Sequence, residues 1–184
     1  MATSPLHLRD AAPEDAPALG ELKLATFRET FLEGFGIGYP PDDLALFEAQ
    51  TYGPARIASE LADPLHRTWV IDAANGPAGR LMGYAHVGPC KLPHPDVGEG
   101  HLELYQLYLR REAQGSGLGR RLLDQALDHM RPRGHPIWLG VWSGNERALA
   151  VYAARGFKVV GEYQFRVGTW LDDEFIMRLD PEPA

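Results

Sequence analysis

The segment with the clearest chemical capability is a glycine-rich run that follows a strand-like pattern and opens a helical one. It reads Gln114-Gly115-Ser116-Gly117-Leu118-Gly119-Arg120-Arg121. Glycine permits tight turns and lets a ligand approach the backbone closely. The first amides of a helix lack intrahelical partners, and the helix dipole favours anions at that end. The run therefore predicts a site for phosphate or pyrophosphate, while a strand–helix turn without a ligand explains the glycines about as well.

Other phosphate and metal motifs do not fit the sequence. A P-loop requires G-x-x-x-x-G-K-[ST], which the chain lacks, and a dinucleotide fingerprint counted from Gly115 would need glycine in place of Arg120. The chain has neither H-E-x-x-H nor paired C-x-x-C, so we predict no metal site. Cys90 and His94 could form a nucleophilic pair, but no surrounding motif supports one.

The elements that must position this run alternate between strand and helix patterns. Runs of alternating or continuous apolar residues predict strands, and 3.6-residue periodicity predicts helices. Strands are expected at 6–9, 68–73, 80–87, 101–109 and 137–141, with two more closing the chain. Helices are expected at 13–31, 118–130 and 146–155, and one or two at 41–62. Asn75-Gly76-Pro77 and Gly79 predict a turn, and the Gly- and Pro-rich stretch 88–100 predicts a substrate-side or mobile loop. This order predicts a mixed α/β sheet.

Composition limits the classes of partner and compartment. The 184 residues suit one domain spanning 1–184, and the formal net charge of −7 argues against duplex nucleic acid as a ligand. No signal peptide or apolar stretch of 18 residues is apparent, so we expect no membrane partner. A single cysteine, Cys90, fits a cytoplasmic location. The acidic balance suits a cationic substrate, although solubility alone would also explain it.

Two motifs in the second half of the chain resemble a known superfamily. Gln114-x-x-Gly117-x-Gly119 is similar to the Q/R-x-x-G-x-G/A signature of GCN5-related N-acetyltransferases, and the preceding strand 103–109 looks like the strand that leads into it. The segment 141–148, followed by Tyr152 and Gly156-Phe157, resembles the second cofactor motif of that superfamily. Two motifs in the right order, separated by one helix and one strand, make the resemblance specific.

The resemblance implies a fold and a cofactor. The fold would be a mixed six- to seven-stranded sheet with splayed central strands and flanking helices, and the cofactor would be acetyl-CoA. The backbone amides of the glycine run would hold the pyrophosphate, the end of strand 101–109 would pair with the pantetheine, and the amide after the strand bulge would face the thioester oxygen. Asn145, which could also simply cap its helix, would contact the pantetheine. The implied cofactor-binding residues are Leu107, Tyr108, Leu109, Gln114, Gly115, Ser116, Gly117, Leu118, Gly119, Arg120, Asn145 and Tyr152.

The same resemblance nominates residues that move protons. An alkyl amine has a pKa near 10.4, so losing its proton at pH 7 costs about 4–5 kcal/mol and requires a base. Glu103 is the first candidate, because in the superfamily a carboxylate on this strand often acts through water; an ion-paired strand residue is the alternative. His86 and His101 are further candidates, although a lone strand histidine is more often structural. Tyr152 resembles the general acid beside the coenzyme sulfur, where it would donate a hydrogen bond to the leaving thiolate.

The acceptor is the part of the function that the sequence defines least. Segments 26–31, 161–168 and 173–177 are similar to the polyamine-acetyltransferase-like PaiA branch, whereas 36–41 departs from it. The branch similarity suggests spermidine or spermine as the acceptor. Because no activated nucleophile is visible, we expect direct transfer to the primary amine of a small molecule, by a monomer or homodimer. Acids such as Glu29, Glu33, Asp42 and Asp43 could attract a polycation or could simply be solvated. The alternatives are a protein N-acetyltransferase and a non-catalytic acyl-CoA-binding module; an RNA-directed toxin does not suit the acidic balance.

Overall fold

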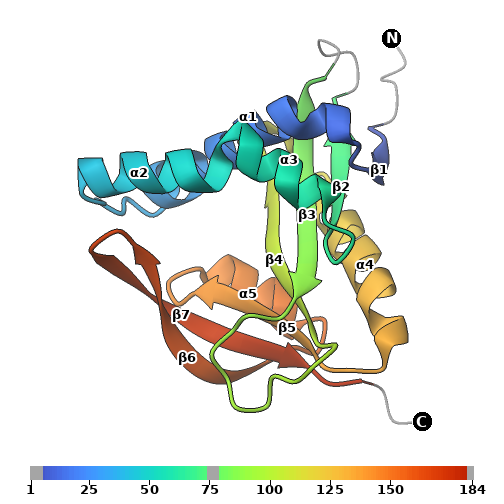
Figure 1. Ribbon diagram of the computed structural model, residues 1–184. Coiled ribbons are helices and arrows are strands. Elements are labelled where there is room, and N and C mark those ends of the chain that lie inside the picture. Colours follow the sequence, from blue (N-terminus) through green and yellow to red (C-terminus); the bar gives the residue numbers. More distant parts are fainter. Residues whose placement is uncertain (1–5, 74–78, 182–184) are drawn as a thin grey trace.

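A twisted seven-stranded sheet runs through the centre of the molecule (Figure 1). The computed structural model describes residues 6–73 and 79–181. The strand order is β1-β2-β3-β4-β5-β7-β6, with β4 and β5 parallel and every other neighbouring pair antiparallel. The strands are β1 (Leu8–Asp10), β2 (Arg67–Asp72), β3 (Leu81–Pro89), β4 (Leu102–Leu109), β5 (Ile137–Trp142), β6 (Lys158–Val167) and β7 (Trp170–Leu179). The sheet is mixed, as the sequence predicts.

Helices cover both faces of the first half of the sheet (Figure 1). Side chains alternate between the faces of a strand, so Trp69 and Ile71 pack with α4 while Val70 between them packs with α1 and α3. The helices are α1 (Ala16–Phe27), α2 (Pro41–Tyr52), α3 (Pro54–Ala62), α4 (Leu118–Met130) and α5 (Glu146–Ala153). Short helical turns are η1 (Pro13–Asp15), η2 (Arg28–Gly34), η3 (Arg111–Ala113) and η4 (Arg131–Arg133). No helix within these described stretches is long and apolar enough to cross a bilayer.

The central strands part in the middle of the sheet. β4 and β5 pair only at Leu102 with Ile137 and at Glu103 with Trp138, after which the two strands diverge. On its other side β4 stays paired with β3, but the register shifts so that Tyr105 has no partner, which is a β-bulge. The splayed central strands implied by the family resemblance are therefore present. They leave a gap between β4 and β5 that side chains of other elements line.

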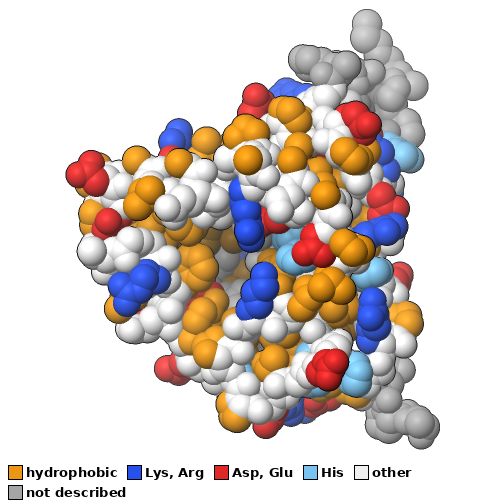
Figure 2. Space-filling view, in the orientation of Figure 1, with side chains coloured by type: hydrophobic (Ala, Val, Ile, Leu, Met, Phe, Trp, Pro, Cys, Tyr) orange, Lys and Arg blue, Asp and Glu red, His pale blue; other side chains and the backbone are white. Residues whose placement is uncertain are grey.

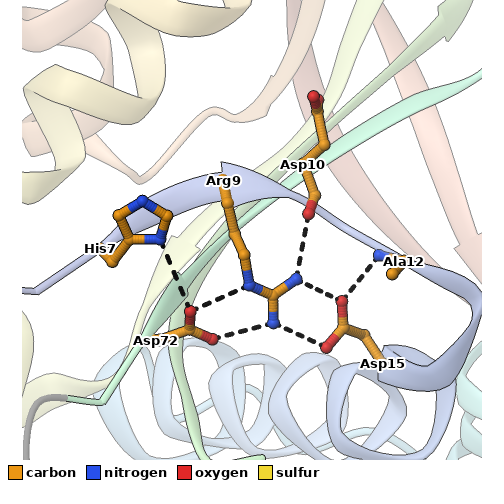
Figure 3. A network of polar contacts seen from close by, with 6 residues as sticks. All are labelled: His7, Arg9, Asp10, Ala12, Asp15 and Asp72. Carbon is orange, nitrogen blue, oxygen red and sulfur yellow. Dashed lines mark hydrogen bonds and ion pairs between the residues drawn. The ribbon is translucent and has the colours of Figure 1, made fainter.

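An ion-pair network fixes the start of the chain onto the edge of the sheet (Figure 3). The Arg9 guanidinium of β1 donates to both oxygens of Asp15 in η1 and to both oxygens of Asp72 in β2, at 2.6–2.9 Å. Asp15 also accepts the Ala12 amide, which caps η1. The Arg9 guanidinium lowers the pKa of Asp15 below its usual value. The network joins β1, η1 and β2 and so orients α1, which follows directly and forms part of the cavity described below.

The structure corrects the sequence predictions at several boundaries. The first strand occupies 8–10 rather than 6–9, where pairing with β2 begins. The predicted helix 13–31 is three elements, because the chain widens after Phe27 into the π-helical turn η2, with Phe35 N–H donating to the Thr30 carbonyl. Contact between the Phe35 and Trp142 rings, 4.4 Å apart, accompanies this wider turn. The predicted turn at 75–77 lies outside the described residues.

Other predicted elements agree closely with the structure. α4 has the predicted bounds of 118–130. The stretch 41–62 contains two helices, since Gly53 breaks it at a point where a Cβ would lie 2.5 Å from the Ala49 carbonyl oxygen. Pro54 then starts α3, at the first helical position that suits proline.

Candidate active site

A cavity of about 440 Å³ lies at the divergence of β4 and β5. The space-filling view shows the molecule hollowed between its α1–α2 part and its β6–β7 part, with hydrophobic and Lys or Arg side chains at the border (Figure 2). Aromatic side chains from α1, η2 and α2 form one wall, and β6 and β7 form the opposite wall. The cavity is lined in part by Phe27, Phe31, Phe47, Tyr163 and Phe165. Charged and polar side chains line the rest of it, and a concave site that combines the two kinds of lining suits a small molecule with polar groups.

The glycine run at the start of α4 has the geometry of an anion site. Gly115 and Gly117 have φ values of 76° and 83°, in the region that favours glycine, and an added Cβ at either position would meet nothing within 4 Å. The first backbone bond that returns to the helix start is from Arg121 N–H to the Gly117 carbonyl, and no side chain caps the helix. The amides of residues 118–120 therefore have no intrahelical acceptor and suit a diphosphate.

The side chains of the glycine run connect it to its neighbours. Gln114 donates to the Leu109 carbonyl at 3.4 Å and accepts from Arg147 at 3.1 Å, so it joins the end of β4 to the start of α5. The Ser116 hydroxyl donates to the Ala113 carbonyl at 2.5 Å. Arg120 is exposed in the first turn of α4. The run does not itself line the cavity, so a ligand bound at both places would extend along β4.

Some of the predicted pantetheine contacts line the cavity, and others lie toward the glycine run. Leu107 and Tyr108 line the cavity, whereas the side chain of Leu109 packs beside Gly119, where a Cβ would lie 3.4 Å from Leu109 Cδ1. Asn145 caps α5 by accepting the Ala148 amide at 3.0 Å, and it also lines the cavity. The cap is therefore present, and the contact between Asn145 and pantetheine stays a prediction.

Tyr152 lies in the cavity wall on α5, half-buried, with its ring 5.8 Å from that of Phe157. Burial raises the pKa of Tyr152 to about 12. A phenol with this pKa keeps its proton at neutral pH and acts as a hydrogen-bond donor. Full proton transfer from such a phenol to a thiolate, whose acid has a pKa near 8.5, would be uphill, whereas donation of a hydrogen bond would not be.

Glu103 lies at the point where β4 and β5 separate. It is 7% exposed, lines the cavity and accepts the Lys91 backbone amide at 2.9 Å. Burial raises the pKa of Glu103, and hydrogen bonds from the Lys91 amide and the Cys90 thiol oppose that rise. Glu103 therefore fastens the loop after β3 to the sheet, and Lys91 and Leu92 of that loop also line the cavity. The predicted substrate-side position of the loop agrees with this arrangement.

The two histidine candidates lie in different places. His86 lines the cavity and is 3% exposed, with Nδ1 2.7 Å from the Thr68 hydroxyl and Nε2 3.1 Å from His66 Nδ1. Burial lowers the pKa of His86 well below its usual value, so its ring is neutral. His101 does not line the cavity, because its Nδ1 accepts from the Trp138 indole at 3.0 Å and from the Gly98 amide at 3.2 Å.

Cys90 and His94 do not form a catalytic pair. His94 Nε2 lies 3.3 Å from the Val160 carbonyl, and its Nδ1 accepts the Asp96 amide at 3.1 Å. Burial raises the pKa of the Cys90 thiol to about 12, so little thiolate exists at neutral pH. Within residues 6–73 and 79–181, no group of three or more His, Cys, Asp or Glu side chains is arranged to hold a metal.

Sequence reasoning missed two carboxylates of β7. Asp172 and Glu174 both line the cavity, next to the tyrosines Tyr39 and Tyr163. Tyr39 donates to Asp172 Oδ2 at 2.5 Å, and the Tyr163 hydroxyl donates to Glu174 Oε2. Burial raises the pKa of Glu174 to about 7, and the hydrogen bond from Tyr163 opposes that rise. The signal was the i, i+2 spacing of the two acids on a strand, which puts them on one face.

Comparisons with known proteins agree with this geometry. Residues 24–157 match the acetyltransferase (GNAT) family. An uncharacterized N-acetyltransferase from the pepI 3′ region of Lactobacillus delbrueckii subsp. lactis is 30% identical over 156 residues, which cover 84% of this chain and 88% of that protein. The L-methionine sulfoximine/L-methionine sulfone acetyltransferase of Pseudomonas paraeruginosa is 28% identical, with 95% of each chain covered.

The fold is also shared with solved structures. The PaiA N-acetyltransferase of Thermoplasma acidophilum, solved in complex with coenzyme A, superposes with a TM-score of 0.72 at 21% identity, covering 96% of this chain and 99% of that one. At this identity the likeness shows the fold and leaves the branch open. With the family match over most of its length, the chain belongs to the GNAT family of acetyl-CoA-dependent N-acetyltransferases.

Proposed function

We propose that the protein transfers the acetyl group of acetyl-CoA to a primary amine of a small molecule, by direct attack within a ternary complex. The observation that carries this proposal is the cavity at the strand divergence, which brings Tyr152 together with the buried carboxylates of β4 and β7. Direct transfer is supported by Cys90, whose raised pKa leaves it a poor nucleophile. A donor, an acceptor and both proton-handling groups can therefore meet in one space.

Each residue has a distinct role in this proposal. Acetyl-CoA supplies the activated acyl group as a thioester. The amides of residues 115–120 hold the diphosphate, β4 aligns the pantetheine at 107–109, and Asn145 contacts it. Tyr152 donates a hydrogen bond to the sulfur as negative charge develops there. A carboxylate at the strand divergence takes the proton from the acceptor ammonium; the sequence nominates Glu103 for this, and the structure adds Glu174.

The finer part of the proposal is that the acceptor is a polyamine. Asp172 is 6% exposed, and its donors among the described residues are neutral: the Tyr39 hydroxyl and, at 2.9 Å, the Trp170 indole. No cationic side chain of residues 6–73 and 79–181 lies within 4 Å of it, so its buried charge lacks a counter-ion. A second ammonium on the substrate would supply one. Because a strand rises about 3.3 Å per residue, Asp172 and Glu174 lie about 7 Å apart, which suits two amines on a short alkyl chain.

The experiment that tests the function is an assay of thiol release from acetyl-CoA with a panel of acceptors. The panel contains spermidine, spermine, putrescine, n-butylamine, amino acids and a peptide with a free N-terminus. Stimulated release with small amines, together with the acetylated amine detected by mass spectrometry, supports the proposal. Release with the peptide alone points to a protein acceptor, and acetyl-CoA binding without release for any acceptor points to a non-catalytic binding module.

Asp172→Asn is expected to reduce the preference of the enzyme for diamines. Putrescine and n-butylamine differ by the second ammonium, so the ratio of their kcat/KM values isolates its contribution. A charge-assisted hydrogen bond contributes about 1.5–3 kcal/mol, so the ratio should fall about tenfold or more. Asp173→Asn is the matched control, since Asp173 is exposed and adjacent on the strand. An unchanged ratio in Asp172→Asn would remove Asp172 from acceptor binding.

Arg120→Glu tests the diphosphate site. A glutamate in the first turn of α4 suits the helix dipole, by about 0.3–1 kcal/mol, so folding should not suffer. The same carboxylate would repel the diphosphate, and we expect the Kd for coenzyme A to rise about tenfold or more, measured by calorimetry. Arg133→Glu makes the same change in net charge at an exposed position beyond the end of α4, and it should leave the Kd unchanged. Equal effects of both variants would mean that net charge alone matters.

A further inference from the structure

We infer that Glu174 is the group that accepts the proton from the acceptor amine, an inference that rests on the proposed function. Its carboxylate lies at the divergence of β4 and β5, within the cavity that also contains Tyr152. Glu174 comes from β7, far along the chain from the strand on which family resemblance places the base. The position, the surroundings and the free oxygen of this carboxylate each support the assignment.

The position of Glu174 is shown by Gly140 on the neighbouring strand β5. A Cβ added at Gly140 would lie 2.8 Å from Glu174 Oε2 and 2.5 Å from the Tyr163 hydroxyl. The side chain of Glu174 therefore lies directly over the backbone of β5, next to the gap that β4 leaves open. Any side chain at position 140 would occupy this place, so glycine is what lets the carboxylate approach the gap.

The surroundings of Glu174 suit a base that works near neutral pH. Glu174 is half-buried, and no Lys, Arg or His of the described part of the chain lies within 4 Å of it. Burial is the main cause that raises its pKa to about 7, and the charges of Asp172 and Glu103 add to it. The titratable groups that face Glu174 from the surrounding elements are Tyr39, Glu103, Tyr108, Tyr163 and Asp172.

The hydrogen bonds of the two buried glutamates distinguish their roles. Tyr163 donates to Oε2 of Glu174 and holds the carboxylate in place, and within the described residues Oε1 has no donor. Glu103 instead accepts the Lys91 amide and contacts the Cys90 thiol, so its carboxylate fastens a loop. Tyr163 thus holds Glu174 in place, and Oε1 of Glu174 remains available to accept a proton. Glu103 acts indirectly, because its negative charge raises the pKa of Glu174.

The proposed step is a single proton transfer. An N–H bond of the acceptor ammonium breaks, an O–H bond forms on Glu174, and the nitrogen keeps the electron pair with which it attacks. The carboxylate form is required, so the step operates above the pKa of Glu174 and fails below it. The plot of kcat/KM against pH should therefore have an ascending limb centred near pH 7, where Glu174 loses its proton.

The test compares Glu174→Gln with the matched control Glu162→Gln. Glutamine keeps the size of the side chain and can still accept from Tyr163, whereas Glu162 is exposed on β6. We expect kcat/KM of Glu174→Gln to fall about 10²-fold with the best amine of the panel, and the limb near pH 7 to disappear. Glu162→Gln should match the parent protein. Retention of both activity and limb in Glu174→Gln would overturn the inference.

Glu103→Gln separates the two carboxylates. If Glu103 only tunes Glu174, removing its charge lowers the pKa of Glu174, so the limb should move to lower pH with a smaller loss of activity. Loss of the limb in Glu103→Gln together with its survival in Glu174→Gln would assign the proton to Glu103 and refute the inference.

A second readout needs no acetyl-CoA. A carboxyl whose pKa is raised on folding binds protons more tightly in the folded state, so the parent should lose stability relative to Glu174→Gln as pH rises from about 4.5 to 7. Urea unfolding of both proteins at pH 5 and pH 8 measures this difference. A difference independent of pH would contradict the inference. Failure of the proposed function looks different, because the parent would then release no thiol with any acceptor.

Discussion

Tyr152→Phe is expected to lower kcat by about 10²- to 10³-fold, the effect of removing one donor from a developing anion. In the proposed function the hydroxyl would act when charge appears on the departing sulfur, so it should contribute little to binding of the intact thioester. The Kd for acetyl-CoA should therefore stay close to that of the parent. The phenylalanine ring keeps the contact with Phe157, 5.8 Å away, so the fold should also be retained. Stopped-flow thiol release and calorimetry measure the two quantities.

Tyr84→Phe is the matched control for this prediction. Tyr84 is 1% exposed, lies under α1 and does not line the cavity. The Tyr84→Phe variant also loses one phenolic hydroxyl. Its kcat should equal that of the parent protein, even if its free energy of unfolding is lower. Parent-like turnover in Tyr152→Phe would clear Tyr152 of a chemical role, and an equal loss in both variants would point to a general effect of hydroxyl removal.

Gly140→Ala is expected to lower kcat/KM about 10³-fold. The new methyl group would lie 2.8 Å from Glu174 Oε2 and 2.5 Å from the Tyr163 hydroxyl, so both side chains must move. Displacement of the proposed base should cost about 10²-fold, as its removal does, and misplacement of the Tyr163 side chain in the cavity should add about a further tenfold. Overpacking should also lower the free energy of unfolding by about 1–3 kcal/mol. Steady-state kinetics at a temperature where the variant stays folded, checked by circular dichroism, gives the result.

Gly38→Ala provides the comparison for this variant. Gly38 is exposed, its φ is not positive and an added Cβ would meet nothing within 4 Å. Its activity and stability should therefore match the parent. If Gly140→Ala were also parent-like, the carboxylate of Glu174 would have to move without consequence, and its place at the strand divergence would not matter for catalysis.

Local patterns in the sequence were enough to predict much of the fold. The apolar stripe of α4 gave its bounds at 118–130, since that helix buries one face against the sheet and exposes the other. The turn before α4 could be predicted from Gly115 and Gly117, because the backbone has a positive φ at both positions and glycine is the residue that favours it. The family motifs then implied the divergence of β4 and β5. The predicted helix 13–31 was wrong beyond Phe27, where the chain forms a π-helical turn. The Phe35 ring directly after that turn contacts Trp142, which is far along the chain.

The family could be recognised from the sequence alone, because its motifs are short segments of neighbouring residues. The amides at the start of α4, the cap at Asn145 and the place of Tyr152 on α5 are all local in this sense. Which acids share the cavity depends instead on how the strands pair. Glu174 and Asp172 lie about 65 residues beyond the end of β4, and they reach the gap because β7 inserts between β5 and β6. Their burial and mutual repulsion, which set the pKa of Glu174, exist only after these strands have paired.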